Sequence, residues 1–281
     1  MRILNATPDS FADGGEHLDP GKAADAAARA VDAGAELLDI GGESTRPGAE
    51  AVDEAGQIAR VVPVIAAIRG RGIEVPITID TTRATVADAA LRAGADAVND
   101  VSGGRDDPAM LGLVARRDVG IVLMHRLRAP ARDSYSNAYD TEPTYEGGVV
   151  AAVRLALGAA ADAARSAGVD PRGIVLDPGL GFGKTVEQNL DLVRGTPALL
   201  ELGYPILSGL SRKSFVGATL AAATGADQPP APADRVWGSV GLSVTHLGLG
   251  ASIFRVHDVG EHRGALDTAW AARVAGPAAA R

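Results

Sequence analysis

The stretch Glu36-Leu-Leu-Asp-Ile-Gly41 is a short, mainly apolar run that leads into a glycine-rich turn. Its apolar residues are nearly continuous rather than alternating, which is typical of a strand buried on both faces of a parallel sheet. Further short apolar runs occur at 2–5, 75–80, 96–99, 119–124, 173–177, 205–209 and 251–256. The sequence therefore indicates a series of short buried strands spread over the whole chain.

Helical patterns separate these runs. They cover 20–33, 53–69, 84–93, 107–116, 146–167, 186–201, 233–248 and 259–275. Such alternation favours parallel strands joined by crossover helices, and 281 residues is an ordinary length for one (β/α)8 barrel. We therefore predict an α/β fold: a single-domain TIM barrel over 1–275, with its active site at the C-terminal ends of the strands, and a frayed tail at 276–281. A doubly wound open sheet is the alternative architecture.

Local signals mark several helix ends. Asp19 followed by Pro20 predicts a helix start, and Asp107 followed by Pro108 predicts another. Glycines at 34, 94 and 168 stand just past predicted helices, where a left-handed residue is expected.

Composition excludes several classes of function. The net charge of −8 argues against general binding of nucleic acid or an anionic membrane surface. The chain has no cysteine, which excludes disulfides, thiolate metal sites and cysteine nucleophiles and is compatible with the cytoplasm. Neither a signal peptide nor an apolar run of roughly 20 residues is present, so we expect no membrane partner.

Polar residues stand at the C-terminal end of every predicted strand. Along the chain they are Asn5, the stretch from Gly41 to Arg46, Asp80, Asn99, Asp100, His125, Asp177, the stretch from Ser211 to Ser214, Arg255 and His257. In a barrel these ends converge on one ring. The carboxylates and amides suit the hydrogen-bonding edge of a flat heterocycle, and the basic groups suit phosphate or carboxylate oxygens.

Two lysines stand out because this chain strongly prefers arginine. Of its 27 basic residues only Lys22, Lys184 and Lys213 are lysines, and the last two lie in glycine- or serine-rich turns. A compact ammonium differs chemically from a guanidinium fork, so lysine at these turns indicates a specific role. The turn from Asp177 to Thr185 resembles a phosphate loop but lacks the spacing of the P-loop and of the dinucleotide-binding motif.

Five separated motifs resemble those of the dihydropteroate synthase family. They are Asn5-Ala-Thr-Pro-Asp-Ser-Phe-Ala-Asp-Gly-Gly15, Asp39-Ile-Gly-Gly-Glu-Ser-Thr-Arg-Pro-Gly48, Asp177 to Thr185, Ser211 to Ser214, and Arg255 to Val259. The match covers nearly the whole chain in the right order. It implies a (β/α)8 barrel, usually a homodimer, that joins a pterin-methyl diphosphate to 4-aminobenzoate in folate biosynthesis.

The resemblance also implies roles for individual residues. The implied pterin-binding set is Asp80, Asn99, Met124, Asp177, Phe182, Gly209 and Lys213. The implied diphosphate-binding set is Asn5, Arg46, Arg255 and His257. The implied aminobenzoate pocket consists of Phe11, Thr45, Pro47, Lys213 and Ser214. Within these sets, the resemblance gives catalytic roles to Asn5, Arg46, Asp177 and Lys213.

Magnesium is the cofactor that the resemblance implies, with Asn5 as its ligand. Mg²⁺ favours oxygen donors and is commonly held by substrate phosphates together with few protein groups. The family mechanism is dissociative: pyrophosphate departs, the pterin methylene becomes cationic and the arylamine attacks. The loops at 6–17 and 42–52 are expected to close over the site and exclude water.

Some points stay open at the level of sequence. A methyltetrahydrofolate methyltransferase with a corrinoid partner would share the pterin-binding acids, and a paralogue without turnover would keep the barrel. The methyltransferase would not need the expected diphosphate residues, which are Asn5, Arg46, Arg255 and His257. A paralogue without turnover would be indicated by loss of Asn5, Arg46 or Lys213, and all three are present. The segment around 126–146 is less typical of the family, and it is interpreted as a lid, a substrate contact or a solvated loop. Sensitivity to sulfonamide analogues of 4-aminobenzoate is not decided by the sequence.

Overall fold

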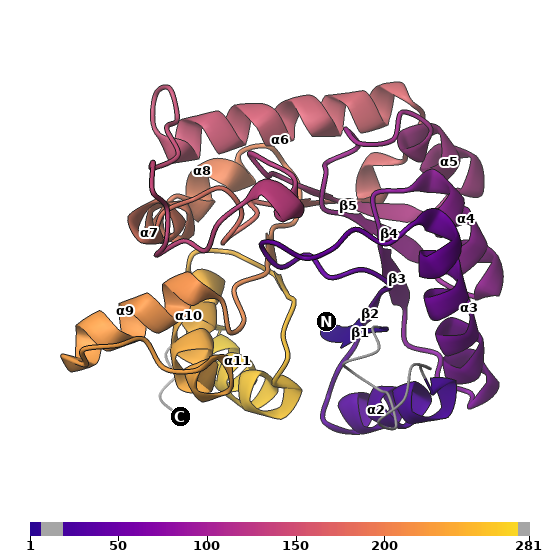
Figure 1. Cartoon of the computed structure of the whole chain (residues 1–281), viewed down its shortest axis with the longest axis horizontal. Helices are drawn as coiled ribbons and strands as arrows, with labels where there is room; N and C mark the ends of the chain where they lie inside the picture. Colours follow the sequence, from indigo (N-terminus) through magenta and orange to yellow (C-terminus); the bar gives the residue numbers. More distant parts are fainter. Residues whose placement is uncertain (7–18, 275–281) are drawn as a thin grey trace, which may run out of the picture.

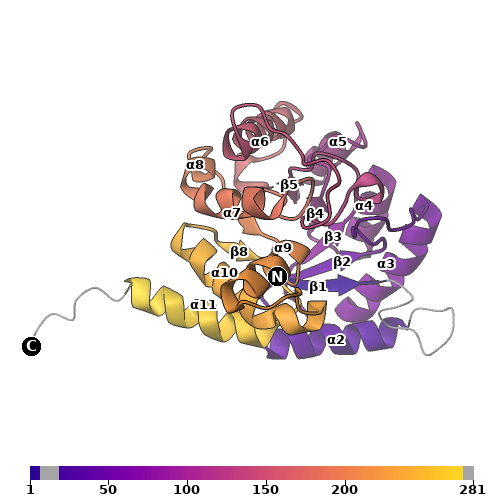
Figure 2. The same cartoon turned by 60° about the vertical axis from the view of Figure 1, so that its left-hand side comes forward.

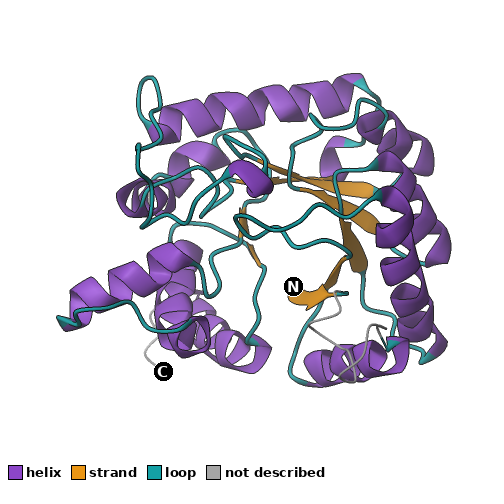
Figure 3. Cartoon of the chain, viewed as in Figure 1, coloured by secondary structure: helices purple, strands orange, loops and turns teal. Residues whose placement is uncertain are grey.

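The computed structural model describes residues 1–6 and 19–274 and places a ring of parallel strands at the centre of the molecule (Figures 1 and 3). One six-stranded sheet runs in chain order through β1 (Arg2–Asn5), β2 (Leu38–Gly41), β3 (Ile77–Asp80), β4 (Ala97–Asp100), β5 (Gly120–Met124) and β6 (Ile174–Asp177). A second sheet pairs β7 (Leu207–Ser208) with β8 (Ile253–Phe254).

Single parallel bridges join the two sheets at both sides. Leu176 in β6 bridges to Ile206 just before β7, and Arg2 in β1 bridges to Val256 just after β8. The amide of Ile3 donates to the carbonyl of Val256 over 3.1 Å, and that of Val256 donates to the carbonyl of Met1 over 3.0 Å. Strand contacts therefore continue around the whole ring, which supports the predicted barrel over the open sheet.

Helices cover the outside of the ring and follow each other in chain order, as the two views in Figures 1 and 2 show. Their bounds are α2 (Pro20–Asp32), α3 (Glu54–Gly70), α4 (Ala84–Ala93), α5 (Met110–Arg117), α6 (Val149–Ser166), α7 (Val186–Arg194), α8 (Thr196–Leu200), α9 (Ser214–Thr224), α10 (Val236–Gly248) and α11 (Val259–Val274). Short 3-10 helices add η1 (Pro130–Arg132), η2 (Pro171–Gly173) and η3 (Pro232–Arg235). No helix of the described residues is both long and apolar enough to cross a membrane.

The helix predicted at 186–201 is two helices, α7 and α8. Pro197 at the start of α8 has no backbone N–H, so it cannot continue the hydrogen bonding of α7. The hydroxyl of Thr196 donates instead to the carbonyls of Val193 over 2.8 Å and Leu192 over 3.2 Å. The local break therefore follows from one proline that the periodic pattern concealed.

Two other helix expectations need correction. Helix α9 adds a separate element between β7 and α10 that the strand–helix series did not include. Helix α5 begins at Met110, later than expected, with Ala109 as its N-cap. The carboxylate of Asp107 still accepts from the amide of Ala109 over 2.9 Å, and it also accepts from the amide of Ala84, at the start of α4, over 2.8 Å. Asp19 caps α2 as predicted, with its side chain accepting from the amide of Gly21 over 2.8 Å.

The strand register brings the predicted polar ends together. Asn5 pairs with Gly41, Gly41 with Asp80, and Asp80 with Asn99, all in one row at the C-terminal ends of β1 to β4. The glycines at 34, 94 and 168 have φ of 96°, 114° and 96°, as expected for left-handed helix ends. The fold thus brings together the ring of polar residues that the sequence predicts.

Candidate active site

Two buried carboxylates, Asp39 and Asp80, and the largely buried guanidinium of Arg255 form the floor of the ring. Arg255 donates from Nε to Asp39 over 2.6 Å and from Nη2 to Asp80 over 2.7 Å. Asp39 also accepts from the hydroxyl of Thr78 over 2.5 Å and from the side-chain amide of Asn99 over 3.3 Å. Burial raises the pKa of Asp80 to about 7, against the opposing charge of Arg255. This floor presents an amide, a protonatable carboxyl and a guanidinium to a polar ligand.

Asp39 was missed as a site residue by sequence reasoning. It lies inside β2 rather than at its end, is only 1% exposed, and links three neighbours around the ring. The usable signal was its position within an otherwise apolar run, because a carboxylate buried in a strand must find a cation or hydrogen-bond donors.

The predicted pterin residues on the other side of the ring also meet. Asp177 is buried, accepts from the amide of Gly179 over 2.7 Å, and has its pKa raised by burial. A Cβ added to Gly209 would lie 3.4 Å from the Asp177 carboxylate, so the bare glycine leaves that edge open. The ammonium of Lys213 lies 4.2 Å from the ring centroid of Phe182 and donates to the carbonyl of Leu180.

Apolar walls complete this part of the site. Met124 and Phe182 pack with Val101 in a small buried cluster of their own, separate from the main core. Burial lowers the pKa of Lys213 to about 7, with the Asp177 carboxylate opposing that shift. The combination of acids, an ammonium and apolar faces matches what a flat polar heterocycle requires.

Lys184 holds the turn 177–185 together and does not face a ligand. It is fully buried, and its ammonium donates to the carbonyls of Phe182 over 2.8 Å and Gly179 over 2.9 Å and lies 3.1 Å from Nδ1 of His125. Burial lowers the pKa of His125 to about 3, helped by the charge of Lys184, which leaves the ring neutral. The specific choice of lysine at 184 is therefore structural.

The segment that follows β5 packs on this turn. Asp133 accepts from the amide of Gly183 over 2.6 Å and from the hydroxyl of Tyr139 over 2.8 Å. The hydroxyl of Tyr145 donates to the carbonyl of Gly183 over 2.6 Å. Of the three interpretations of 126–146, a purely solvated loop is therefore wrong for its middle part, which is a wall beside the site.

A cleft of about 310 Å³ opens beside Lys213 at the C-terminal ends of the strands. It is lined by Asn5, Ser44, Thr45, Arg46, Pro47, Tyr135, Gly181, Ser211, Arg212, Lys213, Ser214, Pro232, Arg235 and His257. The diphosphate and aminobenzoate residues expected from the sequence are largely among them. Arg255 instead belongs to the buried floor, and Phe11 lies outside the described residues.

His257 is placed at this cleft as a neutral ring. Its Nδ1 lies 3.1 Å from the hydroxyl of Ser211. Burial lowers its pKa to about 3, with further lowering from the positive charges of Arg212 and Arg255. The low pKa comes first from burial, and the nearby guanidinium groups of Arg212 and Arg255 add positive charge that favours an anion in the cleft.

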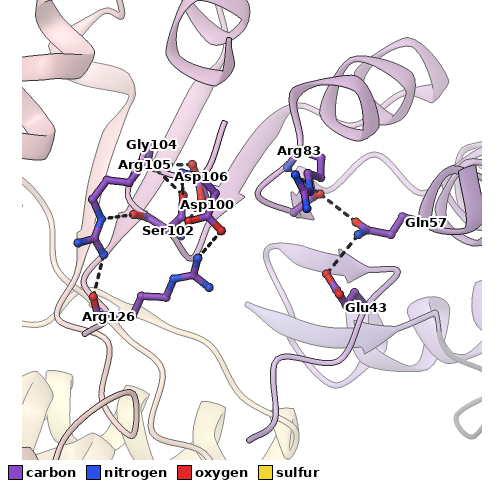
Figure 4. A network of polar contacts seen from close by, with 10 residues as sticks. Glu43, Gln57, Arg83, Asp100, Ser102, Gly104, Arg105, Asp106 and Arg126 are labelled. Atoms are coloured by element: carbon purple, nitrogen blue, oxygen red, sulfur yellow. Dashed lines mark hydrogen bonds and ion pairs between the residues drawn. The ribbon is translucent and has the colours of Figure 1, made fainter. Parts of the chain in front are cut away.

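The loop that carries Thr45, Arg46 and Pro47 is held at its base by hydrogen bonds (Figure 4). Glu43 accepts from the amide of Val52 over 2.9 Å and from the side-chain amide of Gln57 over 3.2 Å. Gln57 in turn accepts from the hydroxyl of Thr81 over 3.0 Å. The loop is thereby anchored to α3 and to the end of β3 while its tip lies over the cleft.

A second network in Figure 4 joins the loops that follow β4 and β5. Asp100 accepts from the amides of Ser102 and Gly104, over 2.8 Å and 2.9 Å. Arg105 donates to the carbonyl of Arg126 over 2.7 Å, and the buried guanidinium of Arg126 pairs with Asp106. These contacts fix the chain directly beyond Asn99 and His125.

Comparisons with known proteins agree with this geometry. The profile of the family described as pterin binding enzyme matches residues 1–257. The chain is 47% identical over 276 residues to the dihydropteroate synthase of Mycobacterium leprae, covering 98% of this chain and 93% of that protein. It is 46% identical over 259 residues to the dihydropteroate synthase of Synechocystis, covering 92% and 84%. A crystal structure of the Xanthomonas albilineans dihydropteroate synthase with 4-aminobenzoic acid superimposes with a TM-score of 0.85 at 41% identity, covering 99% of this chain and 93% of the other.

Proposed function

This chain belongs to the dihydropteroate synthase family of pterin-binding enzymes, and we propose that it joins (7,8-dihydropterin-6-yl)methyl diphosphate to 4-aminobenzoate. The products are 7,8-dihydropteroate and pyrophosphate. The observation that carries the proposal is the position of Lys213, which lies over Phe182 beside the buried acids and also lines the open cleft. One side chain thus connects a pocket for a heterocycle with a pocket for anions.

The pterin is proposed to bind in the buried part of the ring. Asp177 is proposed to take the amino-pyrimidine edge, with Asn99 and Asp80 on the opposite side. Burial keeps the pKa of both acids above the ordinary value, so each carboxyl is able to exchange a proton with the ring as hydrogen bonds form. Met124 and Phe182 supply the apolar faces.

The diphosphate is proposed to occupy the cleft near Asn5, Arg46 and His257. The side chain of Asn5 lines the cleft and makes no hydrogen bond to another described residue. Its amide oxygen is therefore available to Mg²⁺, whose usual partners are a few protein oxygens and substrate phosphates. No group of three or more acidic, histidine or cysteine residues is placed to hold a metal within the described chain. Bound Mg²⁺ would neutralise charge on the departing pyrophosphate.

The chain's own residues are proposed to favour a dissociative displacement. Arg46 and His257 bind the leaving group, so that charge developing on its oxygens is stabilised. Lys213 and Phe182 hold the pterin so that its methylene carbon points along the cleft. The C–O bond to the diphosphate breaks first, pyrophosphate leaves with the bonding electron pair, and the methylene carbon becomes cationic. The arylamine nitrogen then attacks that carbon and loses a proton. Tyr135 and the loop that carries Thr45, Arg46 and Pro47 limit the access of water, which would otherwise capture the cation.

A pyrophosphate-release assay tests the proposal. Purified protein is given the pterin-methyl diphosphate, 4-aminobenzoate and Mg²⁺, with Asp177→Asn as the control variant. Release should need all three components, stop with excess chelator, and fall at least about 100-fold in the variant. Pterin binding by calorimetry without any release would point instead to a paralogue without turnover.

A homodimer and a cytoplasmic location are proposed alongside the reaction. Two large apolar side chains, Leu155 on α6 and Trp237 on α10, are 77% and 74% exposed, and each offers an apolar contact for a second copy. The absence of cysteine is compatible with a reducing compartment. Light scattering on the purified chain tests the dimer, and a single-subunit mass at micromolar concentration would contradict it.

A further inference from the structure

The positive charges of the cleft divide into paired and unpaired groups. Arg212 lines the cleft, but its guanidinium pairs with Asp258, with Nε donating over 2.9 Å. Arg46, Lys213 and Arg235 also line it, and within the described part of the chain none of these three has a carboxylate at ion-pair distance. Arg235 is the only one of the three to which the sequence motifs assign no role.

Arg235, the last residue of η3, is held rigidly against the first turn of α9. Its Nε donates to the carbonyl of Pro230 over 2.8 Å, and its Nη1 donates to the carbonyl of Arg212 over 3.1 Å. The guanidinium lies against Gly217, where an added Cβ would come within 2.5 Å of Nε. Two backbone acceptors and one glycine therefore fix the plane of this group before any ligand arrives.

Three further residues that line the cleft with Arg235 come from α9, η3 and the segment after β5. They are Ser214, the first residue of α9; Tyr135, from the segment after β5; and Pro232, from η3. The hydroxyl of Ser214 accepts from the amide of Ser136 over 3.1 Å, which holds that segment against α9. Asn5 and His257 enter the same cleft from different elements, β1 and the chain after β8. Arg235 on the one hand, and Asn5 and His257 on the other, therefore reach the cleft from different elements, and the proposed diphosphate contacts do not use Arg235.

We propose that Arg235 is the specificity-determining residue for the carboxylate of the arylamine substrate, an inference that rests on the proposed function. The remaining guanidinium nitrogen, Nη2, has no hydrogen-bond partner among the described residues. A guanidinium binds a carboxylate through strong, directional, charge-assisted bonds. Lys213 is engaged with Leu180 and Phe182, and Arg46 lies on an exposed loop, so Arg235 is the cation best fixed for this contact.

The test compares a charged and a neutral arylamine. Pyrophosphate release is measured with 4-aminobenzoate and with 4-aminobenzamide for the wild-type enzyme, Arg235→Gln and Arg235→Lys. In Arg235→Gln the KM for 4-aminobenzoate should rise about 10- to 100-fold, as expected for loss of a hydrogen bond between charged groups. The KM for the pterin-methyl diphosphate and the kcat/KM for 4-aminobenzamide should stay within about twofold. Arg235→Lys keeps the charge and should give an intermediate KM.

Controls separate recognition from support of the turn. Arg154→Gln removes an exposed arginine that pairs with Glu201 on the outer helices and should leave all constants unchanged. If Arg235→Gln and Arg235→Lys slow both arylamines equally, or raise the KM for the pterin substrate as much, Arg235 only supports the turn and the inference is wrong. A wild-type enzyme that is inactive with 4-aminobenzoate would overturn the proposed function itself, whereas an active wild type with an unchanged ratio in Arg235→Gln overturns this inference alone.

Discussion

The floor of the ring and the rim of the cleft differ in whether their charged side chains have a partner of opposite charge within the protein. In the floor, Arg255 lies between Asp39 and Asp80, and each charge has a partner in the protein. At the rim, Arg46, Lys213 and Arg235 face a cleft and have no carboxylate partner among the described residues. Buried charges must be compensated for the chain to fold, because an isolated buried ion is very costly. The rim charges line an open cleft, so their counter-ions can arrive later as substrates.

The largest expected effect is a loss of stability when the cation of the floor is removed. Arg255→Met leaves two buried carboxylates without their cation, so the free energy of unfolding should fall by about 3 to 5 kcal/mol. Urea unfolding followed by circular dichroism measures this. Adding Asp39→Asn should recover part of the loss, since one uncompensated carboxylate disappears. A loss below about 1 kcal/mol in the single variant would show that the floor charges are not coupled to folding.

Two lysines sharpen the comparison, because both have a pKa lowered to about 7 by burial but differ in their contacts. Lys184→Met removes donors to the Gly179 and Phe182 carbonyls, so unfolding should become easier by about 1 to 3 kcal/mol. Lys213→Ala should change stability by less than about 1 kcal/mol. It should instead weaken pterin and aminobenzoate binding together, by about 100-fold in calorimetry. Unchanged binding in Lys213→Ala would remove it from the site.

The smallest effect concerns His257, whose pKa is lowered to about 3 in the free protein. The unfolded chain takes up the proton near pH 6.5, so the contribution of His257 to stability is complete above that pH and is lost as pH falls toward 3. An NMR titration should show no change of its ring between pH 5 and 8. Added pyrophosphate brings negative charge and should raise the pKa by about one unit or more. A midpoint near 6.5 without ligand would contradict the burial of the ring and the positive charges around it.

Much of the site could be read from the chain because parallel strands in a barrel have all their C-terminal ends on one side. That rule alone brought Asn5, Asp80, Asn99 and Asp177 to one ring. The positions of most strands and helices followed from continuous apolar runs and helical periodicity, although β7 and β8 have only two residues each and α9 was not predicted. Proline and glycine at helix ends set most of the boundaries, with Pro197 as the exception that split one helix.

Only the tertiary structure decided which charges are partners. Arg255 and Asp39 are 216 positions apart, and no local pattern relates them. The same holds for Asp133, which reaches Gly183 across 50 positions, and for Arg235, which is aligned by Gly217 and the carbonyl of Arg212. Sequence alone determined that a polar ring exists, because periodicity and strand direction are local properties. Folding determined which of its charges are neutralised inside the protein and which remain for a ligand, because that depends on distances between segments far apart in the chain.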